Sequence, residues 1–299
     1  MKPVRKAVLP VAGLGTRILP AGRAAPKNLL NVFDRPILAH VVAEGRAAGI
    51  EHFIFIVGRG QGAIEDYFDH AYELEHQLEL RGKAELLAST RAELPDPGEM
   101  SFVRQMSPLG LGHAVWCARD LIGDDEPFAV MLPDMLMDAN PPALAQAVAA
   151  HKATGGNIVL VEPAPEGEAH KYGIVAMGGT APGFDGRLKA LTGMVEKPPP
   201  GTEPSNLFIS GRYILSPAIF EHLAAHQAGA GGEIQLTDAM LKLLATTPFH
   251  ALEHVGVTYD CGDTLGLFRA NLAYGLGHPE LGGRARTIMA EAMKDASGG

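Results

Sequence analysis

The sequence of residues 6–17 is Lys-Ala-Val-Leu-Pro-Val-Ala-Gly-Leu-Gly-Thr-Arg, and this stretch decides the fold. Its first seven residues form a short apolar run, which is typical of a buried strand. The run ends at Gly13, and Gly15 follows two positions later, so we expect the strand to enter a tight turn. Glycines in such a turn let the backbone come close to a ligand and point successive amides at phosphate oxygens.

Two common Gly-rich motifs do not fit this turn. A dinucleotide fingerprint requires glycine at position 18, where the chain has Ile18. A P-loop requires Gly-x-x-x-x-Gly-Lys-Ser/Thr, which is absent from the sequence. Two interpretations remain: a phosphate-binding loop in which Arg17 supplies a cation, or an ordinary strand-to-helix turn with a surface arginine.

Apolar runs and amphipathic segments alternate after this turn. Buried strands are expected at 53–57, 102–104, 127–132 and 157–161, and helices at 36–49, 61–80, 112–121 and 142–152. This alternation predicts an α/β fold with a mostly parallel, Rossmann-like sheet flanked by helices.

The pattern changes after Glu162. Strand-like pieces are expected at 172–176, 188–195 and 207–215, followed by helices at 217–226, 233–245, 263–275 and 283–296. We therefore predict a single domain over residues 1–299, with a first part at about 6–162 and a smaller β-rich part at about 163–275. Residues 276–299 would form a helical C-terminal tail.

Composition excludes several classes of protein. The net charge is −9 and no Lys/Arg-rich run is present, so nucleic acid is not an expected partner. Two cysteines cannot form a disulfide framework, and they suit a reducing compartment. No apolar run reaches membrane-spanning length, and no signal-peptide core is present, so we expect a cytoplasmic protein without a membrane partner.

Several short motifs follow one another in a specific order. They are Val11-Ala-Gly-Leu-Gly-Thr-Arg17, Pro26-Lys27, Gly110-Leu-Gly-His-Ala114, Leu132-Pro-Asp134, Val195-Glu-Lys-Pro198, Pro204-Ser-Asn-Leu207, Gly211-Arg-Tyr213, Gly232–Ala239 and Asp260-Cys-Gly262. Together they resemble the bacterial UTP–glucose-1-phosphate uridylyltransferases of the sugar nucleotidyltransferase family. The resemblance implies a glycosyltransferase-A-like fold, UTP and glucose 1-phosphate as substrates, Mg²⁺ as cofactor, and a homodimer or homotetramer.

The resemblance also implies where the nucleotide binds. In this family the nucleotide lies in the first part of the chain, here at Ala12, Gly13, Gly15, Thr16, Gln105, Gly110 and Gly112. Gln105 carries both a donor and an acceptor, as recognition of the uracil edge requires. Its other interpretation is a surface amide at the end of a strand.

The sugar phosphate and the metal fall on other motifs. The resemblance assigns phosphate-binding cations to Arg17, Lys27 and Lys197, and sugar contacts to Gly173, Glu196, Lys197, Asn206 and Tyr213. Asp134 and Asp260 each follow an expected strand, and carboxylate oxygens suit Mg²⁺. Asp134 could instead cap a helix, and Asp260 could be an ordinary turn residue.

The expected reaction is in-line transfer of a uridylyl group from UTP to α-D-glucose 1-phosphate, which releases pyrophosphate. Three positions depart from the family pattern: Asn28 replaces an acid, Asn31 a proline and Leu109 a frequent lysine. They leave open a thymidylyl- or cytidylyltransferase, or a non-catalytic sugar-nucleotide-binding paralogue. A dinucleotide-dependent oxidoreductase is disfavoured by the glycine spacing.

Overall fold

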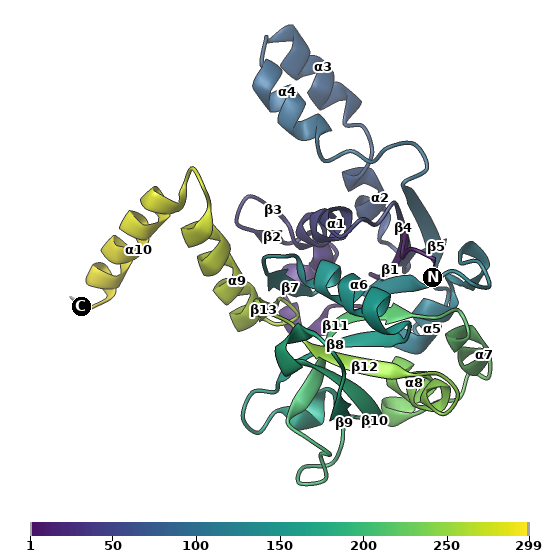
Figure 1. The fold of residues 1–299 in the computed structure, drawn as a ribbon. Helices are drawn as coiled ribbons and strands as arrows, with labels where there is room; N and C mark the ends of the chain where they lie inside the picture. Colours follow the sequence, from purple (N-terminus) through teal and green to yellow (C-terminus); the bar gives the residue numbers. More distant parts are fainter. Residues whose placement is uncertain (1, 298–299) are drawn as a thin grey trace.

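Nine strands form one mixed sheet in a computed structural model that describes residues 2–297, and their order is β5-β4-β1-β6-β11-β8-β12-β10-β9 (Figure 1). The strands are β1 (Lys6–Pro10), β4 (His52–Val57), β5 (Met100–Arg104), β6 (Phe128–Met131), β8 (Asn157–Pro163), β9 (Gly173–Thr180), β10 (Leu188–Glu196), β11 (Leu207–Leu215) and β12 (Phe249–Glu253). Two short pairs lie beside it: β2 (Asn31–Val32) with β3 (Arg35–Pro36), and β7 (Met135–Asp138) with β13 (Val257–Asp260).

The prediction of a mostly parallel sheet holds only for the first half of the chain. Strands β5, β4, β1 and β6 are parallel, but β11 runs antiparallel to both of its neighbours, β6 and β8. The sheet is therefore mixed. Apolar runs show where strands lie but not their direction, because direction depends on which distant strand each run joins.

The later strands continue this sheet instead of forming a separate one. Strand β9 pairs with β10 and also contacts β11 at Phe208 and Ile174, so that five strands close on themselves. Strands β9, β10, β11 and β12 all lie within residues 163–275, and they are built into the same sheet as the strands of the first part.

The helices mostly lie where the sequence pattern places them. They are α1 (Ile37–Ala47), α2 (Gly62–Tyr67), α3 (Tyr72–Leu80), α4 (Ala84–Arg91), α5 (Leu111–Trp116), α6 (Ala143–Thr154), α7 (Ile219–Leu223), α8 (Leu236–Leu244), α9 (Thr264–Gly277) and α10 (Gly282–Ser297). The single helix expected at 61–80 is two helices, and α4 was not predicted. Phe68 packs on Phe55 in the core while Tyr72 is 71% exposed, so the chain leaves the core between α2 and α3. Helices α3 and α4 then project from the body (Figure 1).

Strand β1 lies between two apolar layers. Ala7 and Leu9 face the layer that contains α1 and α6, whereas Val8 faces the layer of α5, α7 and α8. These three side chains are fully buried. The carboxyl end of β1, where the Gly-rich turn begins, is therefore held rigidly at the sheet edge where α/β proteins place their ligands.

The last two helices lead away from the sheet toward the C-terminus (Figure 1). Helix α10 corresponds to the helix expected at 283–296. In the region from residue 2 to residue 297, no helix combines the length and the apolar character needed to cross a membrane.

Candidate active site

A cavity of about 450 Å³ opens at the carboxyl end of β1. Its lining includes all but one of the residues predicted for the nucleotide: Ala12, Gly13, Gly15, Thr16, Gln105 and Gly110. Gly112 is not among the described lining residues; its N–H donates to the Ile234 carbonyl at 2.8 Å, and a side chain there would strike the same oxygen. Glu233 also lines this cavity and was not predicted.

The two glycines of the turn have different roles. Gly15 has a φ of +63°, and a Cβ atom there would lie 3.1 Å from the Cβ of Lys27. A Cβ at Gly13 would meet nothing within 4 Å. The first glycine therefore leaves the loop open toward the cavity, and the second permits the left-handed turn and the close approach of Lys27.

A second cavity of about 470 Å³ lies next to this loop. Four predicted residues line it: Arg17, Asp134, Lys197 and Asp260. Lys27 reaches it through Asp134, since its Nζ lies 2.5 Å from Asp134 Oδ2. Tyr172 and Lys171 also line this cavity, and neither was predicted as a site residue.

The two aspartates meet because β7 and β13 pair. In that antiparallel pair Asp260 lies opposite Met135, and the Cys261 N–H donates to the Asp134 carbonyl at 2.7 Å. Asp260 Oδ1 accepts from the Gly262 N–H at 2.7 Å, and its Oδ2 lies 3.6 Å from Arg17 Nη1. Strand β7 was not predicted, so only the structure accounts for this contact.

The surroundings shift the two carboxyl pKa values in opposite directions. Burial is the largest single influence and raises the pKa of Asp134, but the Lys27 ammonium, together with a backbone hydrogen bond and the charge of Arg17, lowers that pKa overall. Burial, and then the charge of Asp134, raises the pKa of Asp260. A carboxyl group whose ionisation is opposed by a neighbouring carboxylate, as that of Asp260 is by Asp134, favours a bound cation.

These carboxylates fit Mg²⁺ as part of its coordination shell. Across residues 2–297, no group of three or more His, Cys, Asp or Glu side chains could hold a metal by itself. Mg²⁺ commonly takes one or two carboxylates and completes its shell with substrate phosphates and water. Asp134 and Asp260 provide that number of hard oxygen ligands at the wall of one cavity.

The residues predicted for the sugar are only partly assembled. Glu196 Oε2 accepts from the Thr237 hydroxyl at 2.7 Å, and a Cβ at Gly173 would lie 3.0 Å from both oxygens. Thr237 orients Glu196 in this way, although we had not predicted a role for it. Tyr213 is 4% exposed, and burial followed by the charge of Glu196 raises its pKa. Asn206 is exposed. The described lining of the second cavity includes none of the four predicted residues Gly173, Glu196, Asn206 and Tyr213.

The three departures from the family pattern have different surroundings. Asn28 is buried beneath the loop, where its Nδ2 donates to the Val11 carbonyl at 3.4 Å and its Oδ1 has no described partner. Asn31 and Leu109 are exposed. In the described chain, all three are outside the linings of both cavities.

A sequence model of the nucleotidyl transferase family matches residues 6–275. The chain belongs to the nucleotidyl transferase family. This transferase is 45% identical over 281 residues to the UTP–glucose-1-phosphate uridylyltransferase of Bacillus subtilis, and 94% of each chain is covered. The enzyme of the same name from Komagataeibacter xylinus is 43% identical over 265 residues, which are 89% of this transferase and 92% of the relative. The UTP-bound UGPase of Acinetobacter baumannii matches with a TM-score of 0.88 and 41% identity, over 96% of this transferase and 99% of that chain.

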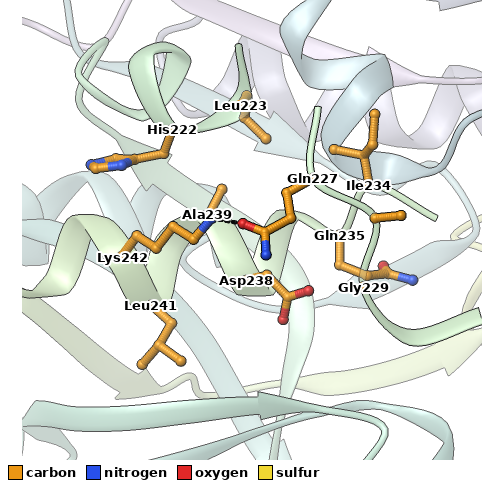
Figure 2. Close-up of a pocket in the computed structure, with 11 residues that line it drawn as sticks. His222, Leu223, Gln227, Gly229, Ile234, Gln235, Asp238, Ala239, Leu241 and Lys242 are labelled. Carbon is orange, nitrogen blue, oxygen red and sulfur yellow. Dashed lines mark hydrogen bonds between the residues drawn. The ribbon is translucent and has the colours of Figure 1, made fainter. Parts of the chain in front are cut away.

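A third cavity of about 280 Å³ lies between α7 and α8, and none of the predicted site residues is among its described lining. Figure 2 shows the polar side chains of His222, Gln227, Asp238 and Lys242 around it. Lys242 Nζ donates to Gln227 Oε1 at 2.6 Å. The lining also includes Ile234 and Gln235, which follow Glu233 of the first cavity.

Proposed function

We propose that this chain transfers a uridylyl group from UTP to α-D-glucose 1-phosphate and forms UDP-glucose and pyrophosphate. The observation that carries the proposal is the position of the loop at 12–17. Its glycines and Thr16 line the first cavity, while Arg17 lines the second. A nucleoside bound in the first cavity would present its phosphates to the cations of the second. The names of the relatives from B. subtilis and K. xylinus support the same activity.

The reaction requires the protein to bring two polyanions together and to offset their charge. In this proposal, the sugar phosphate oxygen attacks the α-phosphorus of UTP in line with the departing pyrophosphate. Arg17 and the loop amides hold the β- and γ-phosphates, and Lys197 holds the sugar phosphate. Asp134 and Asp260 would hold Mg²⁺, which supplies positive charge to the phosphates.

We further propose that the two parts of the chain divide the substrates. The nucleotide would lie mainly on residues 6–162, because the residues that line the first cavity belong to this part, except for Glu233. The second cavity is lined by residues of both parts, for example Asp134 from the first and Lys197 from the second. The sugar would therefore lie against residues 163–275, at the junction of the two.

The activity is tested by pyrophosphate release with glucose 1-phosphate and Mg²⁺, comparing UTP, dTTP, CTP, ATP and GTP. We expect release chiefly with UTP. Release chiefly with another triphosphate would keep the reaction class and overturn the uridylyl assignment. Binding of UDP-glucose without release from any triphosphate would contradict catalysis itself.

Lys197→Met is expected to raise the KM for glucose 1-phosphate by roughly 10–100-fold, because a charge-assisted contact to the sugar phosphate is lost. The KM for UTP should change little. Steady-state kinetics with each substrate varied in turn measures both. Lys189→Met is the matched control, since Lys189 lies on β10 and pairs with Glu253 at 3.6 Å. Equal effects of the two substitutions would contradict the role of Lys197.

A homodimer or homotetramer is also proposed. Helices α9 and α10 carry apolar side chains that are more than half exposed: Leu265, Phe268, Ile288 and Met293. A second copy of the chain could cover such a surface. Light scattering coupled to size-exclusion chromatography measures the mass, and a monomer at micromolar concentration would contradict the proposal.

A further inference from the structure

The side-chain amide of Gln105 is held from two sides at the wall of the first cavity. Its Nε2 lies 3.2 Å from the Gly110 carbonyl oxygen and 3.0 Å from His113 Nδ1. The Gly110 carbonyl can only accept, so the nitrogen of the amide must face it. The reverse orientation would place two oxygens against each other, and the hydrogen-bond network therefore assigns the amide.

This orientation determines the state of His113. Because Nε2 of Gln105 donates, His113 Nδ1 must accept, and the ring must be neutral with its proton on its own Nε2. Burial, followed by the nearby His226 ring at 5.5 Å, lowers the pKa of His113 and favours that neutral form. The Cys117 thiol lies 4.0 Å from the same nitrogen. For the chain between residues 2 and 297, no acidic side chain forms an ion pair with His113.

The other end of the amide is left for a ligand. Within the described residues, no hydrogen bond engages Gln105 Oε1, and Gln105 lines the cavity beside the loop. An oxygen in that position accepts from a donor on the ligand. Uracil offers such a donor at its N3–H, whereas the N3 of cytosine is an acceptor and would be repelled.

We propose that His113 is a positioning residue that holds the carbonyl of Gln105 toward the base and thereby selects uracil over cytosine. This inference rests on the proposed function, since it specifies the base that the first cavity accepts. Cytosine in the same pose would place its N3 acceptor against Gln105 Oε1, and pairing with that N3 requires the amide to turn over, which would break both hydrogen bonds of Nε2. Thymine has the same N3–H as uracil, so His113 does not discriminate against dTTP.

The test compares two substitutions of similar size. His113→Leu removes the acceptor, and His113→Asn replaces it with an amide oxygen. For His113→Leu we expect the KM for UTP to rise about tenfold with kcat little changed, and the ratio of kcat/KM for UTP over CTP to fall at least tenfold. His113→Asn should restore most of this ratio. The ratio of UTP over dTTP and the KM for glucose 1-phosphate should stay as in the wild type.

His226→Asn is the control, because it changes the other ring beside His113 and leaves the acceptor of Gln105 in place. It should keep the wild-type ratio of UTP over CTP. If His113→Leu does not fold, His113→Ala is measured instead. An unchanged ratio in the variant without the acceptor, or equal losses for UTP and CTP that asparagine does not rescue, would overturn the inference.

Direct binding separates this inference from the proposed function. Calorimetry with UTP or CTP alone, in Mg²⁺ buffer, reports base preference without any transfer reaction. A wild type that prefers UTP in binding but does not form UDP-glucose would contradict the proposed function and support the base preference. A wild type that transfers the uridylyl group and binds CTP as tightly as UTP would contradict only the inference about His113.

Discussion

Asp134→Asn is expected to lower kcat for UDP-glucose formation by about a thousandfold or more. Asp134 lies between the Lys27 ammonium at 2.5 Å and the turn that carries Asp260. Its carboxylate is the proposed Mg²⁺ ligand, and asparagine removes the negative charge. The amide oxygen can still accept from Lys27, so the fold and the KM for UTP should change far less than kcat.

The measurement is pyrophosphate release over a series of Mg²⁺ concentrations, with circular dichroism to check the fold. Asp138→Asn is the matched control, because Asp138 ends strand β7, which begins directly after Asp134, and its side chain is exposed. Chelation of the metal should abolish turnover of the wild type, and added Mg²⁺ should restore it. Activity of Asp134→Asn within tenfold of the wild type would remove Asp134 from the metal site.

Arg212→Met is expected to lower the free energy of unfolding by about 3–5 kcal/mol, because it leaves the Glu44 carboxylate buried without its partner. The Arg212 side chain is fully buried and its Nη2 lies 2.7 Å from Glu44 Oε2. The guanidinium also donates to the carbonyls of Leu132 and Met135 at 3.0 and 2.8 Å. These carbonyls lie on either side of the Pro133-Asp134 turn, so kcat should fall as well.

Urea unfolding followed by far-UV circular dichroism measures this effect. Arg5→Met is the control, since Arg5 forms an ion pair with Glu51 in which both side chains are more than half exposed. Exposed pairs contribute little, so no comparable loss is expected there. Glu44→Gln should destabilise the protein in the same direction as Arg212→Met. An Arg212 variant as stable as the Arg5 variant would show that the buried pair does not support the turn.

The candidate site was predictable to different degrees. Residues 12–16 of the nucleotide cavity could be identified from the sequence because they are contiguous. Their glycines directly follow an apolar strand, where a tight turn close to a ligand requires them. Asp134 and Asp260 could be proposed individually from the family resemblance. Thr237 and Arg212 stand inside motifs quoted from the sequence, but their partners Glu196 and Glu44 are distant along the chain. Arginine is seldom fully buried, so its residue type gives no indication that Arg212 lies in the core.

The sequence by itself determined the elements whose causes are local. The apolar run of β1, the glycine turn after it, and helices α1, α6 and α10 follow from residue types and spacing over a few positions. Only the tertiary structure decided the mixed order of the sheet, the meeting of Asp134 with Asp260 across β7 and β13, and the contact of Gln105 with His113. These features depend on which strands pair and in which register, and that choice is made by burial of the whole core and not by any one segment.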